Sequence, residues 1–312
     1  MIFSEYKAQE TSRKVSILDQ INGLFPREEF VQRIDESYSD KVRWRKRTPA
    51  IILIKMMILQ YVFGLSDEAV QEDVYDRKSF YDFVWVTLLN KWWVPDATTL
   101  CKFRKHLNHH SLHETLFTII LEKLEEQWAY LKKGTVVDST IVKAPSNTKN
   151  KERERDPEMK STKKWANYYF GMKIHQWTDV DTGIVHTVKC TSANISDTQV
   201  CEDLLHGQEK FVWWDKWYAS KERKKSFRAK WIYYGILDKK TRSSKLSFSQ
   251  KKRNKKMQSI KAKVELPFWI LKKRWWNKKV RYRWLKKNTS RAVMWLALWN
   301  LFLWHRYLAR VS

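Results

Sequence analysis

Two aspartates in this chain have the chemistry and the predicted placement of metal ligands. Asp138 and Asp215 are each expected at the carboxyl end of a buried strand, in TVVDSTIV and FVWWD. Carboxylates on adjacent strand ends repel one another unless a cation lies between them, so the pair predicts a hard divalent metal with oxygen ligands. A strand-end aspartate more often caps the following turn, and that alternative stays open for each residue alone.

A third carboxylate is needed to complete such a site, and Glu265 is the candidate. It is the only acid between Asp238 and the C-terminus. On a helix, Lys261, Glu265 and Lys272 share one face, which suits a metal-binding carboxylate flanked by phosphate-binding amines. Pro267 is expected either to open this helix or to kink it. The alternative is a glutamate that only forms salt bridges.

The charge around Glu265 predicts a nucleic-acid surface. The 312 residues include 61 Lys and Arg against 34 Asp and Glu, a formal net charge of +27, which excludes an acidic enzyme of small-molecule metabolism as the default. Between Lys221 and Lys287 stand 26 Lys and Arg but only three acids. Such a tract releases counterions from a phosphate backbone, and its interleaved aromatic residues favour nucleic acid over an anionic membrane surface.

Residues 1–130 predict a helical domain that contains a helix-turn-helix. Pro49 begins the helical pattern AIILIKMMILQYVF, Gly64 ends it, and Ser66 is placed to cap the next helix. Two helices joined by so short a turn occur in DNA-reading domains and in plain packing. Both interpretations stay open.

Two further helices are predicted in this first domain. Asp96 is placed to cap ATTLCKFRKHLN, which presents Arg104 and Lys105 as candidate DNA contacts. Ser111 and Glu114 are expected to form a capping box at the start of the helix that follows.

Residues 131–312 predict a mixed α/β domain. The pattern reads strand, hairpin around Asp181-Thr182-Gly183, helix EDLLH, strand FVWWD, a basic insert at about 238–262, and helix. The polar stretch 143–164 has almost nothing apolar to bury and is predicted to be a mobile loop.

For two further segments, a membrane helix and a metal-binding histidine cluster are weaker interpretations than ordinary helices. The C-terminal run AVMWLALWNLFLWHRYLA is interrupted by Asn300 and His305, so a buried helix is predicted and no membrane partner is expected. The three cysteines have no C-x-x-C spacing and no secretory signal is visible, which favours a reducing, cytoplasmic location. Four histidines between His106 and His113 imitate a metal cluster, but a surface helix is the better interpretation.

Seven blocks of sequence, in order, resemble the DDE transposases of the insertion-sequence-five family. They are VVDSTIVKAP, STKK with YFGMKIH, TDVDTGIVHTV, TSANISDTQV, WDKWYASKERK, KVELPFWILKK and KVRYRWLKKNTSRAVMWLALWNL. QYVFGLSDEAV and VPDATTLCKFRKHL are similar to that family's N-terminal domain, so the resemblance runs from about Arg43 to Leu303.

The resemblance implies the fold, the reaction and the cofactor. It implies a ribonuclease-H-like mixed sheet with flanking helices over 131–312, preceded by a helical DNA-binding domain over 1–130. Asp138, Asp215 and Glu265 would be the catalytic acids of a transposase that cleaves and transfers DNA strands at the ends of an insertion sequence. They would hold two Mg²⁺ ions, with Mn²⁺ as the alternative, Asp138 bridging both ions and the other acids binding one each.

The resemblance also implies the partners. These are double-stranded DNA at terminal inverted repeats, target DNA, and a second copy of the chain in a homodimeric synaptic complex, in a bacterial, nucleoid-associated protein. The residues expected to contact DNA are Lys261, Lys272, Lys273, Arg274, Arg281, Arg283, Arg104 and Lys105. Lys261 stands where the family has an arginine, which keeps the charge but weakens a bidentate phosphate contact. Two alternatives remain: a catalytically inactive remnant that acts as a repressor, and an RNA-binding basic protein.

The tryptophan content suggests an unusual genetic code. The chain has 18 Trp but only 7 Gly, whereas glycine is ordinarily about 7% of residues. Six tryptophans occupy positions where the family carries glycine: Trp44, Trp85, Trp165, Trp217, Trp269 and Trp284. Random drift from glycine would reach many residue types, so we hypothesise UGA codons that the source cell reads as glycine. The alternative is that the tryptophans are real.

Overall fold

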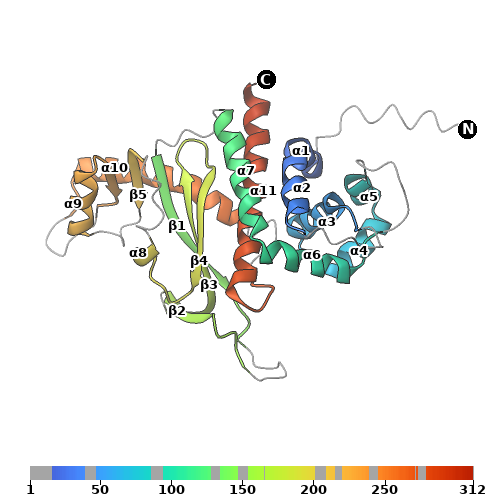
Figure 1. Cartoon of the computed structure of the whole chain (residues 1–312). Coiled ribbons are helices and arrows are strands. Elements are labelled where there is room, and N and C mark those ends of the chain that lie inside the picture. Colours follow the sequence, from blue (N-terminus) through green and yellow to red (C-terminus); the bar gives the residue numbers. More distant parts are fainter. Residues whose placement is uncertain are drawn as a thin grey trace, which may run out of the picture.

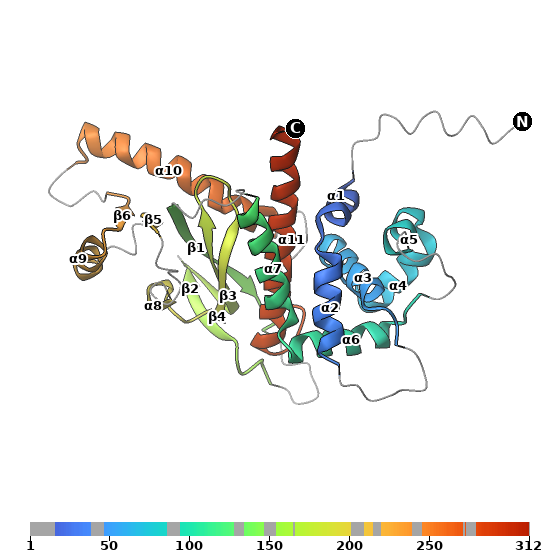
Figure 2. The same cartoon turned by 45° about the horizontal axis from the view of Figure 1, so that its top comes forward.

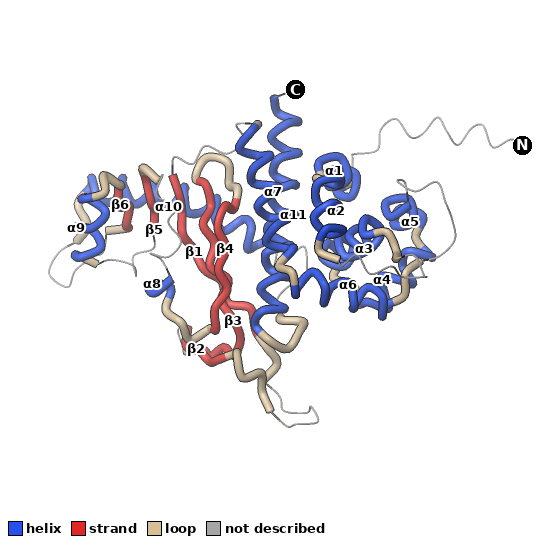
Figure 3. Tube along the Cα trace, in the orientation of Figure 1, coloured by secondary structure: helices blue, strands red, loops and turns tan. Residues whose placement is uncertain are grey.

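The computed structural model describes residues 16–38, 47–85, 94–127, 134–146, 154–164, 166–200, 209–214, 220–238, 245–270, 272 and 279–311. A group of helices lies on one side of the molecule and a six-stranded sheet on the other, with two long helices running between them (Figure 1; Figure 3 shows the same arrangement by element type). The structure therefore has the mixed α/β architecture that the sequence pattern predicts.

The helices that precede the sheet follow one another closely. They are α1 (Ile17–Leu24), α2 (Arg27–Glu36), α3 (Ala50–Phe63), α4 (Asp67–Asp76), α5 (Lys78–Trp85), α6 (Ala97–His109) and α7 (Leu112–Glu126). Helix α3 is mostly apolar, so it can be covered on all sides, and every residue from Ala50 to Val62 is buried.

The predicted caps of α3, α4 and α6 are confirmed. Gly64 takes the left-handed conformation that ends α3, with φ 74°. The Ser66 side chain accepts a hydrogen bond from the Ala69 amide, and Asp96 accepts one from the Thr99 amide. These local bonds satisfy amide groups that each helix leaves free at its start.

The predicted capping box at Ser111 is wrong. Helix α6 ends at His109, and α7 begins at Leu112 after a turn of only two residues. Ser111 takes the left-handed conformation, with φ 53° and ψ 32°, and its side chain makes no capping bond. A capping side chain reaches its amide from an extended backbone, so the sharp turn between the helices overrides the local signal.

The sheet has the strand order β2-β3-β1-β5-β6, and β4 also pairs with β3. Its strands are β1 (Gly134–Lys143), β2 (Lys160–Lys164), β3 (Asn167–Asp179), β4 (Val185–Ser192), β5 (Phe211–Trp214) and β6 (Tyr233–Ile236). Strand β1 pairs antiparallel with β3 and parallel with β5. The hairpin predicted around Asp181-Thr182-Gly183 is confirmed by β3 and β4.

Two details of the predicted strands are corrected. Strand β1 does not end at Asp138 but continues for five residues, because its partner β3 extends past that point and pairs with it as far as Lys143. The stretch 143–164 is not wholly a loop. Its last five residues form β2, which pairs with β3 from Lys160↔Gly171 to Lys164↔Asn167. The predicted helix EDLLH lies outside the described residues.

Helices also lie between and after the later strands. They are α8 (Asp197–Val200), α9 (Lys221–Ala229), α10 (Phe248–Trp269) and α11 (Leu285–Val311). Helix α10 contacts β1 and extends along the β1, β5 and β6 side of the sheet (Figure 2). Helix α11 contacts β3 and β4, and also packs against α7 and α1.

Helix α11 is the buried C-terminal helix that the sequence predicts. Asn300 is fully buried, accepting a hydrogen bond from the Val185 amide at 2.9 Å and donating one to the Val185 carbonyl at 2.7 Å. The asparagine that interrupts the apolar run thus satisfies the backbone of β4. Among the described helices none alone is long and apolar enough to cross a membrane, and only the pair α3 and α4, bent by 102°, passes that test together.

One hydrophobic cluster joins both parts of the molecule. It includes Ile54 of α3, Leu116 of α7, Trp299 of α11 and Ile174 of β3. Helix α7 belongs to the predicted first domain, yet it packs on α11 of the second. The division at residue 130 stays a prediction.

Candidate active site

A cavity of about 320 Å³ lies between β1 and α10, and it brings two of the predicted catalytic acids together. Asp138 enters it from β1 and Glu265 from α10, although 126 residues separate them in the chain. The described residues that line it are Val136, Val137, Asp138, Ser139, Thr140, Lys164, Lys261, Glu265 and Phe268.

Strand pairing positions Asp138. The parallel pairing of β1 with β5 stops at Val136↔Trp213, two residues before Asp138, while the pairing with β3 continues. Side chains alternate along a strand, so Asp138 lies on the same face as Val136. Val136 packs in a small cluster with Trp213 and Ile260 of α10. Asp138 is therefore half-buried on the face that α10 covers, and one of its oxygens accepts the Ser139 amide at 2.8 Å.

Helix α10 positions Glu265. The helix begins with a complete capping box between Ser247 and Gln250. Pro267 lies inside the last turn, so it does not open the helix. The interpretation that Pro267 begins this helix is therefore wrong. Glu265 and Lys261, one turn apart, both line the cavity, as the predicted helix face requires.

Lysines surround the two acids. Besides Lys261, the cavity is lined by Lys164 at the end of β2. Lys272 donates a hydrogen bond to the Thr140 hydroxyl, which also lines the cavity. Burial lowers the pKa of Lys272, nearby Lys164 lowers it further, and Asp138 opposes the shift. The cavity thus combines carboxylates with cations at close range.

Asp215, the remaining predicted acid, lies outside the described residues. Strand β5 ends at Trp214, directly before it. Within the described part of the chain, no group of three or more His, Cys, Asp or Glu is arranged to hold a metal ion. The three-acid site therefore stays a prediction.

Arg104 is not placed to contact DNA, and this prediction is corrected. Its side chain is 8% exposed and pairs with both carboxylate oxygens of Asp67, one of them at 3.1 Å, and with Gln60 at 3.0 Å. Burial raises the pKa of Asp67, but hydrogen bonds from Arg104 and Gln60 outweigh burial and hold the pKa below its ordinary value. The position of Arg104 in the sequence of α6 does not show whether its side chain pairs inside the protein or lies on the surface.

Lys105 lies on the exposed side of α6, as does Lys102. The helix pair α3 and α4 has the predicted helix-turn-helix connection, but α3 is buried. Helix α4, with the sequence DEAVQEDVYD, carries five acids and no Lys or Arg, so it would repel a phosphate backbone. This geometry leaves α6 as the basic helix of the group. The predicted DNA contacts Lys273 and Arg274 lie outside the described residues.

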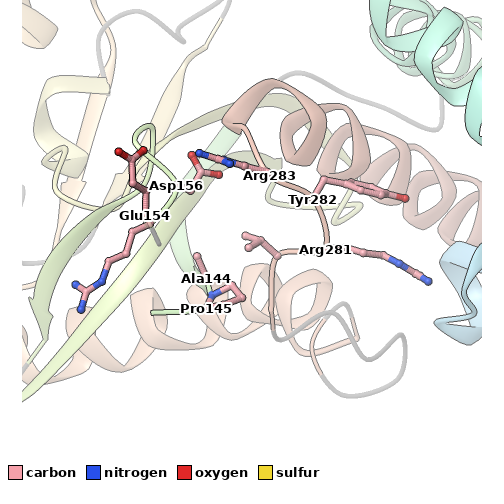
Figure 4. A pocket seen from close by; sticks show the side chains of 9 residues that line it. Ala144, Pro145, Glu154, Asp156, Arg281, Tyr282 and Arg283 are labelled. Carbon is pink, nitrogen blue, oxygen red and sulfur yellow. The ribbon is translucent and has the colours of Figure 1, made fainter. Parts of the chain in front are cut away.

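Arg281 and Arg283 border a second, smaller cavity of about 230 Å³, shown in Figure 4. The Val280 amide donates to the Lys143 carbonyl at 2.8 Å, so this segment continues along the end of β1. Across the cavity lie Glu154, Arg155 and Asp156, whereas the side chain of Arg281 is exposed. Asp156 accepts the Trp284 amide at 2.7 Å, which fixes the start of α11.

Two of the four histidines in this region, His106 and His113, serve packing. His106 stacks on Tyr38 with ring centroids 3.8 Å apart and shares a 2.7 Å hydrogen bond with Ser37. Burial lowers the pKa of His106 to about 4, and burial with nearby Arg104 lowers that of His113 to about 3. Both rings are therefore neutral at neutral pH.

The backbone distinguishes among the tryptophans that were compared with glycine. Trp284 has φ 83°, a conformation that favours glycine. Trp269 ends the helix α10, and Trp85 ends α5, where helical backbone needs no glycine. The other three, Trp44, Trp165 and Trp217, lie outside the described residues.

Two family models match this chain. The model described as Transposase DDE domain matches residues 129–301, more than half of the chain, and the model described as Transposase domain (DUF772) matches residues 5–106. The chain therefore belongs to the DDE transposase family, as its resemblance to the insertion-sequence-five transposases indicates. It is a transposase that acts on DNA, and membership implies dependence on a divalent metal ion.

A solved structure has a similar fold. A chain from "Cryo-EM structure of piggyBac transposase synaptic complex with hairpin DNA (SNHP)" is 9% identical, with a TM-score of 0.50, covering 95% of this chain and 76% of that one. At this identity the likeness concerns the fold alone. With the family match, it confirms the predicted ribonuclease-H-like sheet with flanking helices and a helical N-terminal part.

Proposed function

We propose that this transposase cleaves and transfers DNA strands at the ends of its insertion sequence, using Asp138, Asp215 and Glu265 as its catalytic acids. The observation that carries the proposal is the cavity where Asp138 and Glu265 meet among lysines. Carboxylates beside cations suit a phosphodiester, because the carboxylates hold metal and the amines hold phosphate oxygens.

The donors fit a hard divalent metal. The described lining contains carboxylate and hydroxyl oxygens and no His or Cys, a set that suits Mg²⁺, with Mn²⁺ as the alternative. When bound, two such ions would activate water or a 3′-hydroxyl and stabilise charge on the phosphate. Asp138, Asp215 and Glu265 would hold them.

The spacing of the chain supports Asp215 as the third acid. Asp215 follows Trp213 by two residues, as Asp138 follows Val136, and Val136↔Trp213 is a registered pair of the parallel strands β1 and β5. Because Val136 and Trp213 are paired, the same step of two residues along each chain would bring Asp138 and Asp215 to neighbouring positions at the edge where the pairing of β1 with β5 stops. A third carboxylate at that edge would complete the oxygen ligands around Asp138.

The remaining residues of the cavity would position the substrate. Lys261 would bind a backbone phosphate from the helix side. Lys272 would hold Thr140 through its hydrogen bond, and so fix the strand that carries Asp138. Arg281 and the exposed cations of α10 would extend this contact along the duplex.

Recognition of the terminal inverted repeat would fall to α6, through Lys102 and Lys105. Two copies of the chain would hold the two ends in a synaptic complex, each copy acting on one end. The alternative, a repressor without catalysis, shares the DNA surfaces and differs only in the chemistry of the cavity.

Asp138→Asn tests this proposal. We expect it to abolish Mg²⁺-dependent cleavage of a duplex that carries the DNA flanking the gene, because an amide is a poor ligand for Mg²⁺. Its DNA affinity should stay equal or rise, since one negative charge facing phosphate is removed. The matched control is Asp181→Asn in the exposed hairpin turn, which should cleave like the wild type.

Equal cleavage by Asp138→Asn and the wild type would contradict the metal role. End-specific binding with no cleavage by the wild type would favour the repressor instead.

A further inference from the structure

Strand β2 brings an unexpected lysine to the catalytic cavity. Its sequence, KSTKK, lies in a polar stretch whose pattern predicts no strand. Pairing with β3 gives the segment a fixed course, and the pair Lys164↔Asn167 closes the ladder at the end of β2. The backbone of Lys164 is therefore held at a defined place at the end of the sheet.

Lys164 is the lysine that the sheet contributes to the described lining of the cavity with Asp138 and Glu265. It lines the same cavity as both acids, and Lys261 lines it from α10. Thr140, the hydrogen-bond partner of Lys272, belongs to the same lining as Lys164. A DNA strand that entered this cavity would meet the ammonium group of Lys164 on the sheet side and that of Lys261 on the helix side.

An ordinary explanation exists for lysines on β2. It ends the strand order β2-β3-β1-β5-β6, and edge strands commonly carry lysine because charge prevents pairing with another chain. That explanation suits Lys163, whose ammonium group lies 5.5 Å from the centre of the exposed Tyr168 ring. It does not explain why the next lysine lines a cavity with two carboxylates.

We propose that Lys164 binds a backbone phosphate of the DNA strand that is cut, opposite Lys261, and so positions the scissile phosphodiester between β1 and α10. This role rests on the proposed function. It adds a substrate-binding residue to the acids and to the lysines on α10. A phosphate is the fitting partner, because its charge is delocalised over oxygens that two lysines can share without displacing metal from the carboxylates.

Three variants test the role: Lys164→Gln, Lys164→Arg, and Lys163→Gln as the matched control. Lys163→Gln removes one positive charge from the neighbouring residue of β2. The long-range attraction between the protein and DNA should therefore fall by a similar amount in both glutamine variants. The substrate is a duplex that carries the DNA flanking the gene.

Cleavage is measured in a single turnover with Mg²⁺. We expect Lys164→Gln to lower the rate by about tenfold or more, because a scissile phosphate that is held out of place reacts slowly. Lys164→Arg should recover most of the rate, and Lys163→Gln should stay near the wild type. Equal losses in both glutamine variants would overturn the proposal, since they would reflect only the total charge.

Binding is measured separately, in EDTA so that no strand is cut, over a range of salt concentrations. Loss of one phosphate contact should reduce the slope of log affinity against log salt by about one in Lys164→Gln and leave it unchanged in Lys163→Gln. An unchanged slope in Lys164→Gln would overturn the proposal. Because this readout needs no catalysis, it decides the role of Lys164 even if the wild type cuts no DNA and the proposed function fails.

Discussion

At the scale of single residues, two of the tryptophans that the structure describes stand where the backbone favours glycine. Trp284 has φ 83° and Trp231 has φ 57°. Trp231 follows α9 in a complete Schellman motif, with bonds from the Ile232 amide to Phe227 at 2.9 Å and from the Trp231 amide to Arg228 at 3.1 Å. Glycine is the usual residue at that position, and the Trp231 side chain is 94% exposed. The structure thus adds a seventh tryptophan to the six that the sequence comparison singled out.

Replacing these tryptophans by glycine should stabilise the fold. A left-handed conformation costs a residue with a side chain roughly 1 to 2 kcal/mol, so Trp231→Gly and Trp284→Gly should each raise the free energy of unfolding by about 1 kcal/mol in urea titrations. Trp269→Gly is the contrasting control. It should lower that free energy by about 0.5 to 1 kcal/mol, because Trp269 is helical. Destabilisation by all three variants would contradict a glycine requirement at Trp231 and Trp284.

The buried Arg104 should matter for stability and not for DNA binding. Arg104→Ala empties a buried site and leaves the half-buried Asp67 without its ion-pair partner, so we expect the free energy of unfolding to fall by about 3 kcal/mol. Lys105→Ala, its exposed neighbour, should change stability by less than about 0.5 kcal/mol and weaken DNA binding instead. Urea titration and a DNA-binding assay separate the two effects. An Arg104→Ala protein of normal stability with weakened DNA binding would restore Arg104 as a DNA contact.

At the scale of elements, the junction of α6 and α7 should make stability depend on pH. His113 lies in the first turn of α7, is 1% exposed, and has its pKa lowered to about 3 by burial and by nearby Arg104. Between about pH 3 and the unfolded pKa of about 6.5, His113 binds a proton in the unfolded chain but stays neutral in the folded chain. Stability therefore falls as the pH drops through this window, by about 1.4 kcal/mol per pH unit.

His113→Leu should remove this dependence. Between pH 6.5 and pH 5, its free energy of unfolding should fall by about 2 kcal/mol less than that of the wild type. Urea titrations at the two pH values measure the difference, with His109→Leu on the exposed side of α6 as the control. The same pH dependence in wild type and His113→Leu would show that His113 can accept a proton in the folded state.

Elements whose signals lie in their own residues could be predicted from sequence, and those that depend on neighbours could not. Helices α3, α4 and α6 carry their own stops and caps, at Gly64, Ser66 and Asp96, and the structure confirms them. Strand β2 has no apolar pattern and forms only because β3 offers it a partner. The capping signal at Ser111 was misleading because the turn between two helices dictates its backbone.

The candidate site shows the same division. Asp138 and Glu265 could be predicted because an acid after a strand and a lone acid in a basic tract are visible in sequence, and their placement in one cavity is what that prediction requires. Lys164 was not singled out because its position depends on β2. Arg104 was misassigned because its partners, Asp67 and Gln60, lie on other helices.

At the scale of the whole molecule, the long helices α7 and α11 join the two parts of the chain. They run side by side between the N-terminal helices and the sheet (Figure 1), and one hydrophobic cluster continues from α3 through them to β3. No flexible linker is needed to relate α6 to the catalytic cavity, since α6 leads into α7 after two residues.

This shared core fixes the distance between α6 and the catalytic cavity. If α6 reads the end of the element, the distance from that contact to the cavity is built into the fold and is set in whole base pairs. One added base pair would shift the scissile phosphate by roughly 3.4 Å along the duplex and turn it by about 35°, out of reach of Asp138 and Glu265. Cleavage would then depend on the number of base pairs between the sequence that α6 contacts and the cut site, as well as on that sequence. A DNA end with one extra base pair would still be bound by α6 but would not be cleaved.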